Sequence, residues 1–237
     1  MWLYGTIHDA GAGDVPEAVW RVLADATTFV SELGDYEPDP KKVAALARLP
    51  WGEVLDKQLP PDDWWDLVNA MLGVMNEDEL RHARPWFAVL RLVSNVARSP
   101  KPSMDVALAD RARSHGIAVL HLESWEEQLG ALAASVTVAD LSRAIHERGA
   151  LACQLADLRA AYHSNDAAAL ERMLTGTPSS AVLLGERNRR WLPQIERYLA
   201  GRGAFIAVGL GHLLGEEGLP AMLARAGYTV ERTTGTP

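Results

Sequence analysis

Short apolar runs along the chain predict β-strands near both of its ends. In these runs apolar residues follow one another and do not alternate with polar ones, as expected of parallel strands that are covered on both faces. They span residues 2–7, 27–33, 117–122 and 204–208. A fifth run, at residues 228–232, predicts a strand at an edge of the sheet. Helical stretches at residues 16–26 and 213–226 follow the first and fourth strands, which predicts an α/β core with a central, mostly parallel sheet built from both chain ends.

The middle of the chain has a different pattern. Apolar residues recur at helical spacing over residues 41–98, and no convincing strand occurs there. Residues 140–174 show the same spacing. We therefore expect a single domain over residues 1–237, in which a helical insertion at about 40–100 and a helical segment at about 137–200 cover the sheet.

Composition and charge narrow the choice of partners. Of the 237 residues, 48% are hydrophobic and 23% are charged, as in ordinary soluble globular proteins. The 23 Lys and Arg stand against 31 Asp and Glu, which gives a net charge of −8, and no long basic block occurs. A protein that binds a phosphate backbone needs a basic surface, so we expect no nucleic-acid partner. No apolar run reaches 18 residues, so we expect no transmembrane segment.

Two features bear on the cellular compartment. The single cysteine, Cys153, excludes an internal disulfide and a multi-cysteine zinc site, and its apolar surroundings predict a buried position. The chain as given has no signal-peptide pattern at its start, which predicts a cytoplasmic protein. If a leader has been removed, the protein is extracytoplasmic instead.

Two histidines end the same short pattern, Gly-x-x-His. The first pattern runs from Gly5 to His8, and the second from Gly209 to His212. Each histidine lies at the carboxyl end of a predicted strand, which is where open α/β sheets place their ligands. The glycine before each imidazole allows a close approach of the backbone. The two histidines are therefore candidates for one shared site.

Two glutamates occupy equivalent positions at the ends of the other strands. Glu32 closes the second apolar run, and Glu123 closes the third. A carboxylate after a buried strand is costly unless it is paired or bound to a metal. Two imidazoles with one or two carboxylates suit a divalent first-row metal and leave positions open for water. The alternative is that each glutamate caps the next helix or pairs with an arginine.

Five blocks in fixed order resemble one family. They are LYGTIH (residues 3–8), VSEL (30–33), LHLES (120–124), GERNRRW (185–191) and VGLGHLLGEEGL (208–219). The chain resembles the TraB/PrgY/GumN family over nearly its whole length, and specifically its GumN-like branch. The resemblance implies the fold of Tiki metalloproteases and erythromycin esterases. It also implies a metal-dependent peptidase centre that works with manganese or cobalt; zinc is a further candidate for the metal.

The resemblance assigns roles to individual residues. His8 and His212 are implied as metal ligands, with Glu32 as a further ligand or general base and Glu123 as the second candidate for the catalytic glutamate. Arg187 and Asn188 match the motif Glu-Arg-Asn/Asp, and we expect them to bind substrate or to orient the metal ligands. We expect the same role for Gly5 and Gly209, because they begin the two Gly-x-x-His patterns.

The leading hypothesis is thus a metal-dependent hydrolase that acts on a peptide or another amide or ester bond. A second hypothesis is a binding protein that takes a peptide, a polysaccharide-related partner or haem at the same place without turnover. A third is a metal-free esterase in which one histidine is the general base. His121, two residues before Glu123, is a minor site candidate. Trp64, Trp65 and Trp86 could line a groove, but core packing is the favoured interpretation.

Overall fold

The computed structural model describes residues 1–34, 39–97, 102–201 and 203–233. The chain divides into two compact units. The first, the sheet unit, comprises residues 1–35, 99–124 and 158–237, and the second, the helical unit, comprises residues 36–98 and 125–157. The expectation of a single domain is left untested by this division and stays a prediction.

The described residues of the sheet unit form a parallel sheet of four strands in the order β1-β4-β2-β3. The strands are β1 (Trp2–Thr6), β2 (Thr28–Leu33), β3 (Ala118–Glu123) and β4 (Ala204–Gly209). Strands β1 and β4 are direct neighbours, with Thr6 opposite Gly209. The α/β class and a sheet built from both chain ends are therefore confirmed, and the sheet is parallel throughout.

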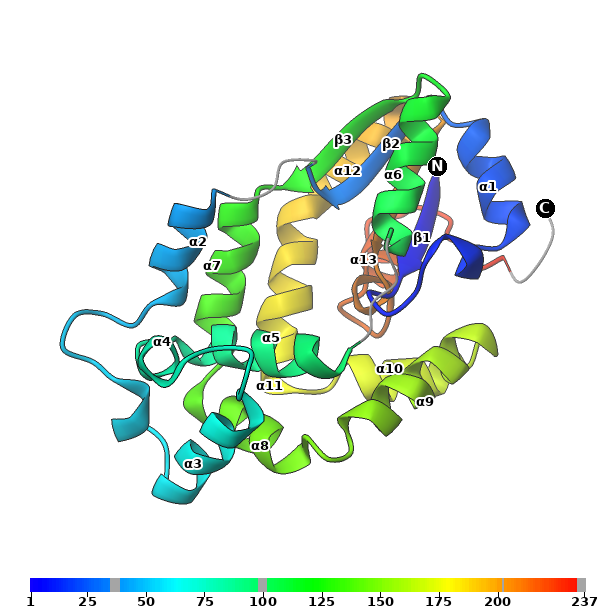
Figure 1. Ribbon diagram of the computed structural model, residues 1–237. Helices are drawn as coiled ribbons and strands as arrows, with labels where there is room; N and C mark the ends of the chain where they lie inside the picture. Colours follow the sequence, from blue (N-terminus) through cyan, green and yellow to red (C-terminus); the bar gives the residue numbers. More distant parts are fainter. Residues whose placement is uncertain (35–38, 98–101, 202, 234–237) are drawn as a thin grey trace. The chain divides into compact units, whose positions relative to one another are not determined.

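Both faces of the two central strands, β4 and β2, are buried, which explains why these strands are continuous apolar runs. Phe29 of β2 and Phe205 of β4 pack on one face against α1 (Glu17–Ala24) and α6 (Met104–Ser114). Val30 and Ile206 point to the other face, where α12 (Arg187–Gly201) and α13 (Leu219–Arg225) cover them. Figure 1 shows α6 in front of the sheet and α12 behind it. The sheet is thus the middle of three layers.

Shorter elements complete the sheet unit. They are η1 (Ala12–Asp14), α10 (Ala167–Leu174), α11 (Pro178–Ser180), η3 (Ala181–Glu186), η4 (Leu210–Leu213) and the end of α9 (Leu151–His163). Of these, η4 follows β4 directly, and α9, α10, α11 and η3 precede α12 in the chain.

The expected edge strand at residues 228–232 is wrong, because this segment has no regular secondary structure. Gly227 ends α13 with a φ of +94°, and the Tyr228 amide donates back to the Leu223 carbonyl at 3.1 Å. The exposed segment then directs Arg232 to Asn165, with Nη2 at 2.5 Å from Oδ1. The helical stretch expected at residues 213–226 thus forms a helix over Leu219–Arg225, but the residues beyond it do not pair with the sheet.

The helical unit contains helices and, among its described residues, no strand beyond one isolated bridge. Its elements are α2 (Pro40–Ala47), η2 (Leu55–Lys57), α3 (Pro61–Ala70), α4 (Glu77–Arg81), α5 (Pro85–Val96), α7 (Trp125–Ser135), α8 (Val138–Glu147) and the first residues of α9. Leu67, Leu92, Leu141 and Ile145 pack together in its core. The helical reading of the chain's middle is thus confirmed.

Two of the three candidate tryptophans in this unit serve packing. Trp64 and Trp86 are buried, as core packing requires, whereas Trp65 is 57% exposed. Cys153 on α9 is exposed, so its expected burial is wrong. The reason is that α9 buries little of itself: among its residues only Ala161 is fully buried. None of the described helices is long and apolar enough to cross a bilayer.

Candidate functional site at the carboxyl edge of the sheet

The four parallel strands end at one edge of the sheet, and the candidate residues follow these ends. In the register, Thr6 lies opposite Gly209, and Leu33 lies opposite Glu123. Glu32 and Glu123 are therefore at the same edge as the residues that follow β1 and β4. Parallel pairing of the strands is enough to place these residues at one edge, whatever contacts their side chains make.

Arg187 enters this edge from a helix that begins in an unusual way. Residues Ala181–Glu186 form a π-helical segment, η3, and Arg187 is the first residue of α12. Its Nη1 donates to the Leu183 carbonyl at 3.0 Å, one turn back. Helix α12 is held on the sheet by Trp191 and Ile195, both buried. Short π-helical segments are common at functional sites, because they redirect the side chains that follow.

The guanidinium of Arg187 links the two candidate glutamates. Its Nε lies 3.1 Å from both carboxylate oxygens of Glu123, and its Nη2 lies 2.6 Å from Glu123 Oε1 and 2.8 Å from Glu32 Oε2. Both Arg187 and Glu123 are buried. Burial by itself would lower the pKa of Arg187. The hydrogen bonds and charges of Glu123 and Glu32 outweigh this effect, so the pKa of Arg187 is raised. Burial also raises the pKa of Glu123, against the opposing pull of Arg187.

His212 is buried at 2% exposure, and its tautomer follows from its neighbours. The amide nitrogen of Asn188 donates to two carbonyls, of His212 at 3.1 Å and of Glu217 at 2.7 Å. The amide oxygen of Asn188 is therefore the atom that faces His212 Nδ1 at 2.7 Å, so Nδ1 carries the proton. Nε2 is then unprotonated; it accepts from Arg187 Nη1 at 3.1 Å and lies 3.6 Å from Glu32 Oε1.

We call the residues joined by these contacts the cluster: Glu32, Glu123, Arg187, Asn188 and His212. Trp191 of α12 packs beside it. Its ring centroid is 4.4 Å from that of His212, and the Arg187 guanidinium carbon is 4.7 Å from the centroid of its ring. An indole in this position excludes water and favours the cation beside it. Burial lowers the pKa of His212 to about 4, and the charge of Arg187 acts in the same direction. His212 is therefore neutral in the folded protein at neutral pH.

The two motif glycines permit close approaches at this edge. The Gly209 amide donates to Glu32 Oε1 at 2.5 Å, and a Cβ on Gly209 would lie only 3.0 Å from that oxygen. A Cβ on Gly5 would lie 2.5 Å from Leu210 Cδ1. The absence of a side chain at both positions allows β1, η4 and Glu32 to come together, as the sequence suggested.

His8 lies at the same edge but in a different environment. Its side chain is 88% exposed, and its Nδ1 is 3.8 Å from Asp105 Oδ2 on α6. The Asp105 carboxylate raises the pKa of His8, and the more distant charge of Glu32 adds to this effect. The charges of Glu32 and Arg187 thus act on His8 through space, although His8 touches neither residue in the contacts described.

The structure brings together most of the predicted site. Direct contacts join Glu32, Glu123, Arg187, Asn188 and His212, whereas His8 contacts Asp105. Within residues 1–34, 39–97, 102–201 and 203–233, no group of three or more His, Cys, Asp or Glu side chains is close enough to hold a metal ion. The metal role of His8, His212 and Glu32 stays a prediction. The alternative that the glutamates pair with an arginine describes the observed contacts.

Two contributors to this edge were missed in the sequence. Trp191 lies inside the motif block of residues 185–191, so its position four residues after Arg187 could have indicated a shared helix face. Asp105 lies outside the motif blocks, and only the packing of α6 brings it to His8. The minor candidate His121 is exposed on β3, and its ring lies over Gly34 rather than with the buried Glu123.

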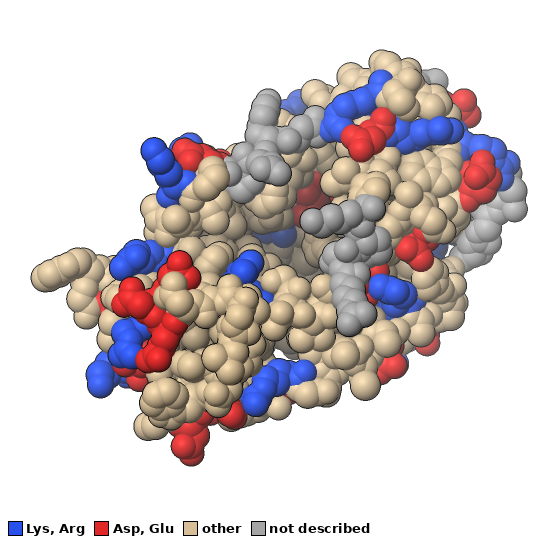
Figure 2. Space-filling model, viewed as in Figure 1, with Lys and Arg blue, Asp and Glu red and all other residues tan. Residues whose placement is uncertain are grey.

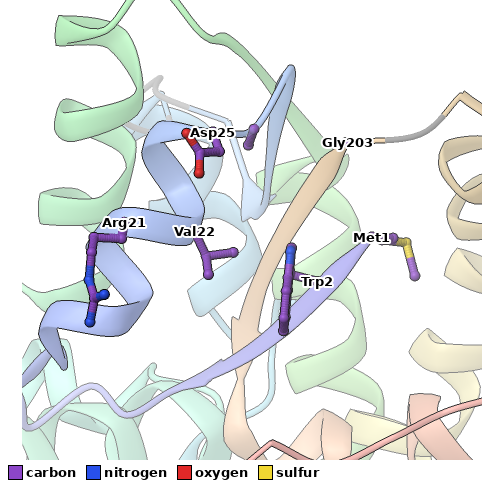
Figure 3. Close-up of a pocket in the computed structure, with 7 residues that line it drawn as sticks. Met1, Trp2, Arg21, Val22, Asp25 and Gly203 are labelled. Atoms are coloured by element: carbon purple, nitrogen blue, oxygen red, sulfur yellow. The ribbon is translucent and has the colours of Figure 1, made fainter. Parts of the chain in front are cut away.

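A pocket lies at the opposite end of the strands. It encloses about 510 Å³ beside Trp2 of β1, Arg21 and Val22 of α1, and Gly203 just before β4 (Figure 3). Trp2 and Gly203 are at the amino ends of β1 and β4, so the pocket is separate from the candidate site. On the face drawn in Figure 2, basic side chains are interspersed with acidic ones and do not form one large basic patch.

The neutral state of His212 predicts a pH dependence of stability. In the unfolded chain the imidazole takes a proton near its ordinary pKa of 6.5, whereas in the folded protein it resists protonation down to about pH 4. This contribution to stability is complete above pH 6.5 and is lost as the pH falls towards 4. The loss amounts to about 3 kcal/mol in the free energy of unfolding.

Urea unfolding between pH 4 and 8 measures this dependence. The His212→Gln variant should show a shallower fall in stability with decreasing pH than the wild type, and His115→Gln, at the exposed end of α6, should keep the wild-type slope. Equal slopes for wild type and His212→Gln would contradict the assignment of a neutral, buried imidazole.

Comparison with known proteins identifies one relationship. The model of the TraB/PrgY/gumN family matches residues 1–232 of the 237. No curated protein and no solved structure matches the chain. The family match covers all four strands and every residue of the cluster.

Proposed function

Because this chain belongs to the TraB/PrgY/gumN family, we propose that it is a metal-dependent hydrolase whose reaction takes place at the carboxyl edge of its sheet. The substrate we propose is a peptide or another molecule with an amide or ester bond. His212, Glu32 and His8 would hold a divalent first-row metal, with manganese, cobalt and zinc as candidates. Glu123 would support the site through Arg187.

The observation that carries this proposal is the state of His212. A metal-binding histidine has a neutral ring, with one nitrogen unprotonated and the other N–H held by an oxygen acceptor. His212 has all of these properties, since Asn188 holds Nδ1 and burial keeps the ring neutral. Glu32 Oε1 lies 3.6 Å from the unprotonated Nε2, so one ion could use both atoms as ligands. The donor chemistry of this pair therefore fits the metal.

The residues around the pair have distinct tasks. A bound metal would lower the pKa of its water and polarise the carbonyl of the substrate. Arg187 now donates to the same Nε2 that would bind the metal, so this contact has to open while the Glu123 contacts of Arg187 remain. Glu32 would be a ligand through Oε1, or would take the proton of the attacking water. His8, exposed at the same edge, would be the third ligand.

Metal binding tests the proposal directly. We expect wild-type protein to bind Mn²⁺, Co²⁺ or Zn²⁺ in calorimetric titration, and each of His212→Ala, Glu32→Gln and His8→Ala to weaken binding at least tenfold. His121→Ala, a histidine of the same sheet outside the cluster, is the matched control and should keep wild-type affinity. Wild type that binds none of these ions, or ligand variants that bind as tightly as His121→Ala, would overturn the assignment.

A second candidate is a hydrolase that needs no metal. The observation that favours it is the exposed His8 ring beside Asp105, together with an Arg187 that already occupies Nε2 of His212. A histidine paired with a carboxylate can take the proton of an attacking water. Hydrolysis of a peptide or ester library that resists chelator and disappears in His8→Ala would support this candidate. Saturable binding of a library member without turnover would support a binding protein instead.

A further inference from the structure

We propose that Asp105 is a positioning residue for His8: it accepts the Nδ1 proton of the ring and leaves Nε2 as the nitrogen that faces substrate or metal. The proposal adds to the site described above a residue from α6, which lies outside the motif blocks. Its role for the reaction rests on the proposed function, but the orientation of the ring does not.

The Asp105 carboxylate is itself held in place. Thr6 Oγ1 donates to Asp105 Oδ1 at 2.6 Å, and Thr6 is buried at the end of β1. With Oδ1 engaged, Oδ2 is the oxygen that lies 3.8 Å from His8 Nδ1. Thr6 is the last residue of β1, and His8 lies in the turn two residues further along the chain. Thr6 therefore fixes the Asp105 carboxylate, and the other oxygen of that carboxylate is the one that lies nearest to the His8 ring.

The backbones that carry these residues are also joined. The Met104 amide donates to the Ala10 carbonyl at 2.9 Å, and Gly11 forms an isolated antiparallel bridge with Ser103. Arg159 binds the same loop, with Nη2 at 2.5 Å from the Asp9 carbonyl. The loop after His8 and the first turn of α6 are thus fixed to each other. A ring 88% exposed can rotate to shorten the 3.8 Å separation from a carboxylate that stays in place.

The two Gly-x-x-His patterns share this design. In the second pattern, Asn188 from α12 holds Nδ1 of His212 at 2.7 Å and leaves Nε2 towards Glu32. In the first pattern, Asp105 from α6 faces Nδ1 of His8. Each histidine therefore has a helix-borne oxygen next to Nδ1, hydrogen-bonded at His212 and 3.8 Å away at His8, and these two helices cover opposite faces of the sheet. An acceptor on one ring nitrogen determines which nitrogen is unprotonated.

Nitrogen-15 NMR of the imidazole rings tests the proposal in the metal-free protein. The His8 signals are identified by their loss in His8→Gln, and spectra are recorded at a pH where the ring is neutral. In the wild type we expect the Nδ1–H tautomer to predominate at His8. In Asp105→Ala we expect the populations to reverse, so that Nε2–H predominates. Asp105→Asn, which keeps the shape of the side chain, should shift the populations in the same direction by less.

Asp110→Ala is the matched control, because Asp110 is an exposed aspartate on the same helix that pairs with Arg113. It should leave the His8 tautomer unchanged. Predominance of Nε2–H at His8 in the wild type, or an unchanged tautomer in both Asp105 variants, would overturn the proposal. If the tautomer reverses but no Mn²⁺, Co²⁺ or Zn²⁺ binds, the inference stands and the metal-dependent function fails. If metal binds, Asp105→Ala should weaken it about ten- to a hundredfold.

Discussion

Replacement of Arg187 by methionine is expected to lower the free energy of unfolding by about 3–5 kcal/mol. The substitution keeps much of the side-chain volume but removes the guanidinium that lies between Glu32 and Glu123. Glu123 is buried and would be left with a charge that lacks its closest cation. The cost therefore comes from an uncompensated buried carboxylate more than from the loss of a favourable ion pair. Equilibrium unfolding in urea at pH 7 measures it.

Arg189→Met is the matched control for this experiment. Arg189 lies two residues further along α12, and its partner Glu217 is exposed, with Nη2 at 2.6 Å from Oε2. An exposed ion pair contributes about 0–1 kcal/mol, so this variant should unfold almost like the wild type. The double variant Arg187→Met/Glu123→Gln should regain part of the lost stability, because the unpaired charge is then removed as well. Equal effects of Arg187→Met and Arg189→Met would contradict the importance of the buried cluster.

Replacement of Trp191 by alanine is expected to lower the free energy of unfolding by about 3–5 kcal/mol, because it opens a cavity in the core between α12 and the sheet. Trp191 is buried among Ile195, Val208 and Leu219, and its ring also packs on His212 and Arg187. Its loss admits water to the cluster, so the pKa of His212 should rise from about 4 towards its ordinary value. Urea unfolding and NMR titration of His212 measure the two effects.

Trp51→Ala provides the comparison for the same loss of volume. The Trp51 side chain is fully exposed, so its removal should change stability by less than about 0.5 kcal/mol. A Trp191→Ala variant as stable as Trp51→Ala, or one in which the pKa of His212 stays near 4, would show that the indole neither supports the core nor keeps water from the cluster.

The strands and the strand-end residues could be predicted from the sequence because their signals are local. Each of the four strands corresponds to an apolar run, and the candidate histidines, glutamates and glycines lie within about three positions of a strand end. Parallel pairing then places these ends at one edge. The close approaches at Gly5 and Gly209 could be predicted in the same way, because a glycine three residues before a histidine allows the backbone to come close to any partner.

Local signals also explain the two errors. Residues 228–232 have the polarity of an edge strand, but strand formation needs a free neighbour in register, and Gly227 turns the chain back on α13. Cys153 lies in an apolar stretch, but burial depends on what packs against that side of α9, and the cysteine is exposed. In both cases the sequence describes what a segment could do, and its neighbours in space determine the outcome.

By itself, the sequence determined the fold class, the four strands, the helical middle and the residues that gather at the carboxyl edge. Only the tertiary structure decided that Arg187 lies between two glutamates, that Asn188 sets the tautomer of His212, and that Asp105 faces His8. The physical reason is the distance along the chain over which each effect acts. Hydrophobic periodicity and chain direction act over a few residues, whereas Arg187 takes its partners Glu123 and Glu32 from strands 64 and 155 positions away in the chain.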